Sequence, residues 1–233
     1  MNSIHPTAIV AGDVVLGEGN TVGAFAVVTG PVVLGDGNWI GTGAVIGAPP
    51  EVRSWPHPGD ALQPSSGSGI RIGDRNVIRE YAQVHQGWHA ETVLGNDTFV
   101  MNQSYVAHDS VIGDGATLAS SVLLAGHVTV GAGANLGLGV SVRQRSAIGA
   151  GAMIGMGAVV VTDIAPYVLA YGNPAGPRSV NAVGLRRAGM SERIIAELAA
   201  VHPAEWDDDT LARFAELDTV GAVFAEWRGR GRG

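Results

Sequence analysis

The sequence contains neither cysteine nor lysine. Without cysteine the chain can form no disulfide and no thiolate metal site, and a cysteine nucleophile is excluded. All 14 basic side chains are arginine, whose planar guanidinium suits bidentate binding of phosphate. A bias of composition would also remove lysine, so its absence alone does not indicate a phosphate ligand. Six of the arginines lie between residues 143 and 193: Arg143, Arg145, Arg178, Arg186, Arg187 and Arg193.

Long hydrophobic runs are also missing. No segment approaches the ~18 apolar residues that a membrane span needs, although 46% of the 233 residues are hydrophobic and only 15% are charged. The first ten residues lack a basic stretch followed by an apolar one, so we expect no signal peptide and a cytoplasmic protein. The net charge of -7 argues against general nucleic-acid binding, which relies on basic surface.

An aliphatic residue recurs at every sixth position through most of the chain. The series begins at Ile4 and Val10 and continues to Ile46, restarts from Ile72 to Val84, and runs again from Leu94 to Val160. Fixed-period self-similarity indicates a solenoid, and a period of six predicts a parallel β-helix. Three such hexads form one triangular coil, so that residues 18 apart stack on each other. We expect this β-helix to cover residues 1–177.

Two excursions interrupt the repeat, at residues 48–69 and 85–93. Counting hexads places Ile46 and Val84 on the same face of neighbouring coils, so both loops should leave at one corner. Long loops in a compact body are often functional. Beyond Val160, residues 167–177 read as an extended exit and 178–233 as a helical extension. Within it, helices are expected over 192–200, capped by Ser191, over 209–217 and over 220–227.

Histidines gather on the face from which the loops depart. The hexads that begin at Val84, Val106, Leu124 and Val142 share this face, and they predict a stacked column of His85, His108, His127 and Arg143. Histidine is well suited to proton transfer near neutral pH, and Asp109 is placed to orient His108. Two other interpretations stay open. The histidines could be ordinary surface, or they could pack against another copy of the chain.

A metal site is the next alternative, because clustered histidines can bind Zn²⁺. The motifs Ile72-Gly73-Asp74 and Ile154-Gly155-Met156 resemble the γ-class carbonic anhydrases. That family carries a second histidine five residues after a Gly-His pair, whereas Ala132 stands there after Gly126-His127. We therefore expect no metal and no bound cofactor.

An ordered set of motifs resembles the UDP-N-acetylglucosamine O-acyltransferase family of lipid A biosynthesis, from residue 4 to about residue 195. The motifs are Ile4-His5-Pro6-Thr7-Ala8, Gly47-Ala48-Pro49-Pro50, Ile72-Gly73-Asp74-Arg75-Asn76, Ala107-His108-Asp109, Leu124-Ala125-Gly126-His127-Val128, and Asn181 with Gly184-Leu185-Arg186-Arg187. This resemblance implies a left-handed parallel β-helix, a homotrimer, and acyl transfer from acyl carrier protein to an amino-sugar nucleotide.

The resemblance also implies roles for residues. His108 would be the general base, Asp109 would support it, and the Gly126 N–H would stabilise the oxyanion. Substrates would contact a second set: His85, His127, Arg143, Gln144, Met156, Asn181 and Arg187. Arg187 would bind a phosphate of the carrier arm or of the acceptor. Met156 falls where the family measures acyl length and usually has glycine, so a shorter acyl pocket is expected.

Departures from the family pattern fall on the residues that read the acceptor. Glu51-Val52-Arg53-Ser54-Trp55 replaces a Gln-Asp-Leu-Lys-Tyr segment, Tyr105 stands where a histidine is usual, and Val183 replaces a glutamate. On this resemblance we expect the acceptor to be a nucleotide-activated amino sugar or a related polar compound and the donor to be a carrier-protein or CoA thioester. The sequence leaves open whether the product is an ester or an amide. Two alternatives remain: an acetyl-CoA-dependent sugar N-acetyltransferase, indicated by Tyr171-Gly172-Asn173-Pro174-Ala175, and a non-catalytic trimeric scaffold.

Overall fold

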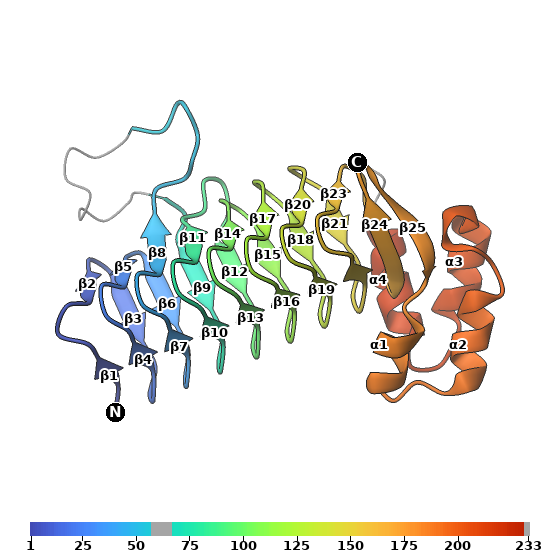
Figure 1. The fold of residues 1–233 in the computed structure, drawn as a ribbon, viewed down its shortest axis with the longest axis horizontal. Helices are drawn as coiled ribbons and strands as arrows, with labels where there is room; N and C mark the ends of the chain where they lie inside the picture. The colour runs from blue at the N-terminus through green and yellow to red at the C-terminus, as the bar shows by residue number, and fades with distance from the viewer. Residues whose placement is uncertain (57–66, 231–233) are drawn as a thin grey trace.

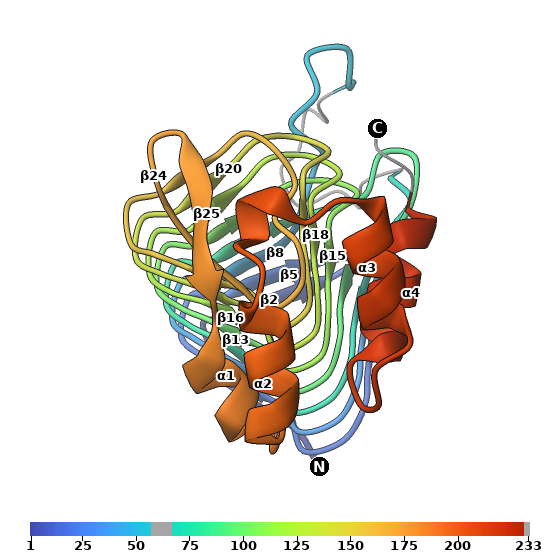
Figure 2. The ribbon, with the colours of Figure 1, turned by 90° about the vertical axis from the view of Figure 1, so that its right-hand side faces the viewer.

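The computed structural model describes residues 1–56 and 67–230. Its strands stack into three sheets that run along a prism, with the excursion near the N-terminal end and the helices at the C-terminal end (Figure 1). Viewed along the axis, successive coils superpose on a triangle (Figure 2). The predicted fold class, a left-handed parallel β-helix with a small helical extension, is confirmed.

Sheet A has ten strands: β1 (Ser3–Ile4), β4 (Thr21–Val22), β7 (Trp39–Ile40), β10 (Val77–Ile78), β13 (Phe99–Val100), β16 (Thr117–Leu118), β19 (Asn135–Leu136), β22 (Met153–Ile154), β24 (Val168–Gly172) and β25 (Ala175–Val180). Sheet B has eight: β2 (Ile9–Ala11), β5 (Val27–Thr29), β8 (Val45–Ala48), β11 (Gln83–His85), β14 (Tyr105–Val106), β17 (Leu123–Leu124), β20 (Ser141–Val142) and β23 (Val159–Val160). Sheet C has seven: β3 (Val14–Leu16), β6 (Val32–Leu34), β9 (Ile70–Ile72), β12 (Thr92–Leu94), β15 (Val111–Ile112), β18 (Thr129–Val130) and β21 (Ala147–Ile148).

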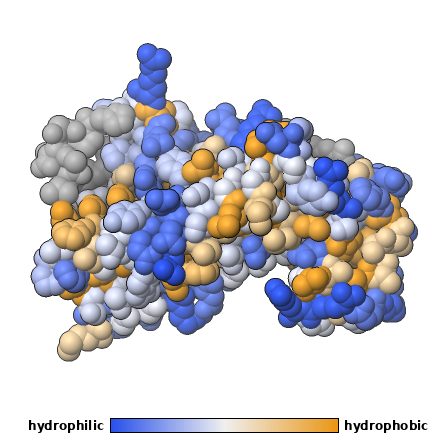
Figure 3. All heavy atoms as spheres, in the orientation of Figure 1, coloured by the Kyte–Doolittle hydropathy of each residue, from blue (hydrophilic) through white to orange (hydrophobic). Residues whose placement is uncertain are grey.

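The sixth-position aliphatic residues form the core. Ile46, Val84 and Val106 pair in register on neighbouring strands of sheet B, and all three are fully buried. Ile4 and Val10 follow the same repeat yet are 44% and 36% exposed, because no coil lies beneath the first one. Apolar surface at the N-terminal end of the prism is visible in Figure 3. Position in the stack thus decides whether a repeat residue is buried.

Both excursions leave at the corner between sheets B and C, which we call the B–C corner. The first follows β8 and returns in β9, and the second follows β11 and returns in β12. The prediction of a shared corner is confirmed. Residues 57–66 of the predicted excursion 48–69 lie outside the described residues.

A ladder of buried asparagines runs along a second corner. Asn76 donates its backbone N–H and its side-chain amide to Asn38 Oδ1, each at 2.9 Å, and Asn38 in turn donates to Asn20 Oδ1. The Asn76 side-chain oxygen also accepts from the backbone N–H and hydroxyl of Thr98, at 2.7 and 2.6 Å. These bonds satisfy polar groups that the turns would otherwise leave buried and unpaired.

The C-terminal part begins with the antiparallel pair β24 and β25, where the sequence predicted a single extended exit. The predicted boundary between residues 177 and 178 falls inside β25. The helices are α1 (Ala182–Arg187), α2 (Glu192–Ala199), the 3₁₀ helix η1 (Pro203–Glu205), α3 (Asp208–Ala215) and α4 (Gly221–Gly229). Ser191 caps α2 as predicted. The short α1 was not foreseen, because six residues give too little periodicity.

Aromatic rings join the helices to the last coils. Trp206, Phe214 and Phe224 pack at centroid distances of 5.0 to 5.9 Å, and Tyr167 contacts Phe224 at 5.8 Å. The helical extension therefore closes the C-terminal end of the prism and shields its last coil. Among the described residues no helix has the length and apolarity that a bilayer crossing requires.

Candidate active site

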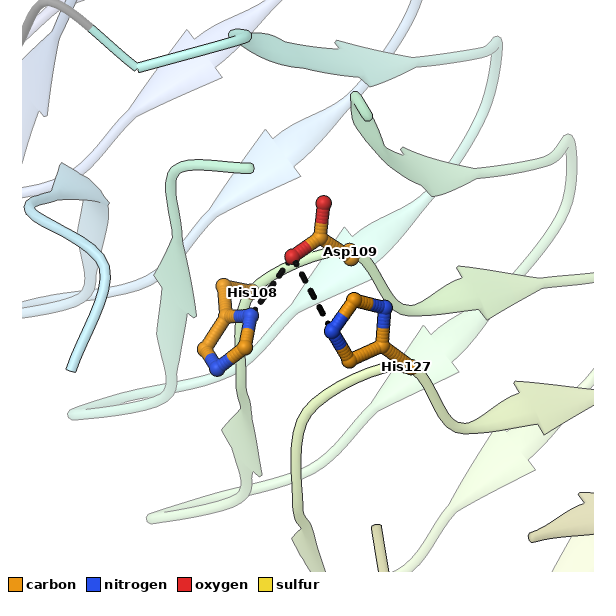
Figure 4. A group of neighbouring side chains, drawn as sticks. All are labelled: His108, Asp109 and His127. Atoms are coloured by element: carbon orange, nitrogen blue, oxygen red, sulfur yellow. Dashed lines mark hydrogen bonds and ion pairs between the residues drawn. The ribbon is translucent and has the colours of Figure 1, made fainter. Parts of the chain in front are cut away.

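Two imidazoles and a carboxylate converge at the B–C corner (Figure 4). His108 Nδ1 lies 2.6 Å from Asp109 Oδ2, and His127 Nε2 lies 3.7 Å from the same oxygen. The two imidazole rings meet edge to face, with centroids 5.2 Å apart. His108 comes from the turn after β14 and His127 from the turn after β17, one coil further along.

Asp109 is held firmly from its other side. Its Oδ1 accepts the backbone N–H groups of His89 and Ala90, at 2.7 and 2.6 Å, and its own N–H donates to Thr92 Oγ1 at 3.0 Å. The carboxylate is 1% exposed. The second excursion therefore closes over Asp109 and fixes the direction in which Oδ2 points.

These bonds set the charge of the carboxylate. Burial alone would raise the pKa of Asp109, but the hydrogen bonds from His108, Ala90 and His89 outweigh it and lower that pKa. An ionised Asp109 accepts a proton-bearing Nδ1 from His108 and so leaves the lone pair on Nε2. The Nε2 atom of His108 is thereby prepared to act as a base.

The pKa of His127 is shifted in the same direction. Burial is the main cause, opposed by the charge of Asp109 and assisted by the guanidinium of Arg145. His127 thus favours the neutral imidazole, which can donate or accept a hydrogen bond.

Gly126 lies directly against the ring of His108. A Cβ at this position would come within 2.5 Å of His108 Cε1 and 2.6 Å of Nε2, so only glycine leaves the ring its place. Among residues 1–56 and 67–230, the Gly126 N–H has no hydrogen-bond acceptor. The basic nitrogen of His108 therefore lies beside an unpaired backbone donor.

The three side chains could also be read as metal ligands, because their ligand atoms lie within 4.8 Å of one another. The geometry favours a hydrogen-bonded dyad instead. The 2.6 Å contact between His108 and Asp109 is a hydrogen-bond distance, and Zn²⁺ at ~2.0 Å from each donor would push the two atoms further apart.

The predicted single column of histidines was wrong in register. The pairs Val84 with Val106 and Val106 with Leu124 place His85 over Ala107, and His108 over Gly126. The column of His127 contains Asp109 and Arg145 instead. The histidines occupy different positions within their turns, and the left-handed backbone of Asp109 and His127, φ +59° and +61°, turns their side chains toward each other.

His85 belongs to a separate group at the base of the first excursion. It is 4% exposed, its Nδ1 lies 2.9 Å from the carbonyl oxygen of Pro49, and its ring contacts Tyr105 at 5.0 Å. The Tyr105 hydroxyl donates to Glu51, and burial together with this carboxylate raises its pKa. His85 Nε2, 3.8 Å from Glu51, has no hydrogen-bond partner among the described residues. An unpaired buried nitrogen is a candidate ligand contact.

Among the described residues, none of the remaining predicted residues has a hydrogen bond or ring contact with His108 or Asp109. Arg143 and Gln144 line a cleft between the last coils and the helices. Met156 is 76% exposed, on the turn between sheets A and B. Asn181 caps α1 by accepting the Gly184 N–H and donates to the Gly151 carbonyl, so its amide already has structural partners. Arg187 ends α1 and is exposed.

Sequence reasoning missed the residues of the second excursion that touch the dyad. Trp88 meets His108 edge to face at 5.9 Å, and His89 stacks on His127 at 6.2 Å. Their adjacency in sequence, directly after the His85 strand, was the available signal. The amide donors to Asp109 carried none, since any residue supplies a backbone N–H.

Comparison with known proteins gives a consistent result. Residues 163–210 match the family model for the second domain of UDP N-acetylglucosamine O-acyltransferase, and residues 91–126 match the bacterial transferase hexapeptide repeat. The chain is 39% identical over 158 residues to the acyl-[acyl-carrier-protein]–UDP-N-acetylglucosamine O-acyltransferase of Paraburkholderia phytofirmans, covering 64% of this chain and 60% of that protein. The enzyme of the same name from Gloeothece citriformis is 36% identical over 143 residues, 60% of this chain and 52% of that protein.

These alignments span between one half and two thirds of the curated relatives they match. The structural match is longer. The UDP-N-acetylglucosamine acyltransferase from Campylobacter jejuni superposes with a TM-score of 0.82 at 26% identity, covering 100% of this chain and 96% of that one. The similarity thus includes the C-terminal helices as well as the β-helix.

Proposed function

The chain belongs to the UDP-N-acetylglucosamine O-acyltransferase family, and on that premise we propose that it transfers an acyl group from a thioester to a nucleotide-activated amino sugar. The observation that carries the proposal is the contact of 2.6 Å between His108 and a buried, N–H-clamped Asp109, with Gly126 against the same ring. These are the parts that general-base acyl transfer requires.

His108 is the general base in this mechanism. Its Nε2 removes the proton from the acceptor hydroxyl or amine as the oxygen or nitrogen attacks the thioester carbonyl. Asp109 holds the Nδ1–H and stabilises the imidazolium that forms. When the C–S bond breaks, the imidazolium returns its proton to the departing thiolate. One new ester or amide bond replaces one thioester bond, and His108 ends as it began.

Gly126 completes the site for the tetrahedral intermediate. The negative charge on the former carbonyl oxygen needs a donor that is already oriented, and the unpaired Gly126 N–H lies beside the basic nitrogen. Losing one such donor typically costs about 10²–10³ in rate. His127, kept largely neutral by its surroundings, is placed to donate to the acceptor or donor from the next coil.

The acceptor lies toward the first excursion in this proposal. His85, Tyr105 and Glu51 lie where this excursion leaves the β-helix, at the same B–C corner as His108. Glu51 and Tyr105 differ from the pattern that the family resemblance predicts, so the acceptor can differ from UDP-N-acetylglucosamine while the chemistry is kept. The donor is acyl carrier protein or CoA carrying the acyl group, and Met156 limits acyl length.

A homotrimer is part of the proposal. The dyad lies on an outer corner, while Met156 and Arg187 lie elsewhere on the same chain. In a trimer, Met156 and Arg187 of a neighbouring copy reach the dyad, so that each active site lies between two copies. The cytoplasmic address stays a prediction.

Product analysis tests the function. Purified protein is incubated with UDP-N-acetylglucosamine and a panel of short to long acyl-carrier-protein and acyl-CoA thioesters, and products are identified by mass spectrometry. An acylated sugar nucleotide, with shorter acyl groups preferred, is expected. If no donor acylates this acceptor or a panel of related sugar nucleotides while the trimer is intact, the scaffold alternative holds and the proposal is wrong.

A further inference from the structure

A large cleft lies between the β-helix and the helical extension, beyond the His108 dyad. It encloses 970 Å³ and is bounded by the last two coils on one side and by η1, α3 and α4 on the other. Arginines outnumber carboxylates on its walls, whereas the chain as a whole carries a net charge of -7. Four guanidinium groups line it: Arg143, Arg145, Arg228 and Arg230.

Within the part of the chain that the structure describes, these four arginines have no ion pair with a carboxylate. Among the described residues, five arginines form ion pairs with acidic side chains: Arg71, Arg75, Arg79, Arg186 and Arg193. None of the four cleft arginines is among them. Among the described residues, the Arg143 guanidinium donates only to the Val161 carbonyl, at 3.3 Å. The cleft also holds two carboxylates, Asp163 and Asp208, and Asp163 already accepts the Ala147 N–H. Cationic groups therefore remain in excess.

Two indole rings complete the walls. Trp206 is 8% exposed and packs edge to face on Phe214, so its position is fixed. Trp227 is half-buried and lines the cleft beside Arg228 on α4. Unpaired guanidinium groups bind phosphate, and aromatic faces bind planar rings. The combination matches a phosphorylated nucleoside better than it matches a simple anion or an apolar ligand.

The cleft adjoins the catalytic corner. Arg145 lies in the same column as His127, one strand further along, and its backbone N–H donates to the Gly126 carbonyl at 3.0 Å. Asp163 continues this column on the next coil. Strand spacing in a β-helix is about 4.8 Å, so the rim of the cleft at Arg145 lies one coil beyond Gly126 and His127 and two coils beyond His108.

We infer that this cleft binds a phosphorylated nucleoside through Arg143, Arg145, Arg228 and Arg230, with Trp227 against the base. The inference deepens the proposed function, on which it rests for the identity of the ligand. Two substrates carry this chemistry: the acceptor, through its UDP group, and a CoA donor, through its adenosine 3′,5′-bisphosphate end. Both present phosphate esters joined to a planar base.

Binding measured without turnover tests the inference. Isothermal titration of the full chain uses UDP, adenosine 3′,5′-bisphosphate, pyrophosphate, uridine and adenosine as probes. The variant Arg228→Gln/Arg230→Gln should weaken both nucleotides and pyrophosphate by about tenfold or more, as expected for the loss of charge-assisted hydrogen bonds. Trp227→Leu should weaken nucleotides but leave pyrophosphate unchanged. Arg193→Gln, an exposed arginine outside the cleft, is the matched control and should change nothing.

Tighter binding of adenosine 3′,5′-bisphosphate than of UDP would assign the cleft to a CoA donor, and the reverse order would assign it to the acceptor. Equal affinity of wild type and the double variant for every probe, or no binding of either nucleotide, would overturn the inference. Because the titration involves no chemistry, its outcome is independent of whether His108-dependent acyl transfer is found.

Discussion

Asp109 Oδ2 lies 2.6 Å from Nδ1 of the adjacent His108. Neighbours in sequence seldom point at each other on an extended strand, where side chains alternate. Here the turn supplies the geometry: Asp109 adopts φ +59°, which swings its carboxylate back toward the preceding ring. A tight corner of the β-helix thus builds a dyad from two consecutive residues.

Replacing Asp109 with asparagine should abolish most activity while the fold persists. The asparagine amide can donate to His108 Nδ1, which favours the tautomer with the proton on Nε2. Nε2 then has no free lone pair to act as a base. We expect kcat to fall by about 10²–10⁴ with little change in KM. Steady-state kinetics of acyl transfer measures the effect. A variant that keeps wild-type kcat would show that Asp109 does not orient the base.

Gly126→Ala should inactivate through steric displacement of His108. The new Cβ would lie 2.5 Å from His108 Cε1, so the ring must move away from Asp109. Its backbone conformation is open to alanine, since Gly126 has no positive φ. The matched control is Gly176→Ala, where a Cβ meets no atom within 4 Å. We expect loss of activity only in Gly126→Ala, with far-UV circular dichroism unchanged in both.

The depressed pKa of His127 predicts a pH dependence of stability. As pH falls through the ordinary histidine range near 6.5, the unfolded chain binds a proton before folded His127 does, so the folded state loses stability in that window. His127→Gln removes this contribution. Urea unfolding at pH 7.5, 6.5 and 5.5 should show a smaller loss of unfolding free energy in the variant. An identical pH dependence in both proteins would contradict the depressed pKa.

The asparagine ladder predicts a large stability effect away from the site. Asn76→Ala removes the oxygen that accepts both the buried backbone N–H and the hydroxyl of Thr98, and each orphaned donor costs about 1–3 kcal/mol. Asn135→Ala, on the exposed face of sheet A, is the matched control and should shift stability by about 0.5 kcal/mol or less. Equal urea midpoints for the two variants would show that the ladder is not structural.

The hexad repeat predicted strands and their stacking, because burial of Ile46, Val84 and Val106 depends only on position in a period of six. It did not predict which turn positions meet. His85 follows the buried aliphatic residue of its hexad by one position, His108 by two and His127 by three, and the path of the turn decides where each side chain points. Hexad counting places a residue on a face, but contact between side chains needs the turn dihedrals.

The supports of Asp109 lay outside sequence reasoning for another reason. The carboxylate accepts hydrogen bonds from the backbone N–H groups of His89 and Ala90. Because every residue except proline has such a group, only the conformation of the excursion shows which ones reach Asp109. The cleft arginines show the same limit. Arg143 and Arg145 were recognised as a cluster, but only the packing of α4 brings Arg228 and Arg230 opposite them.

The most direct test of the central claim is the kcat of His108→Ala in acyl transfer, measured beside His5→Ala, the same change at an exposed histidine of the first coil. The account predicts that His108→Ala loses about 10²–10⁴ in kcat and that His5→Ala keeps it, with both variants folded and equally assembled. Full activity in His108→Ala would contradict the assignment of His108 as the base.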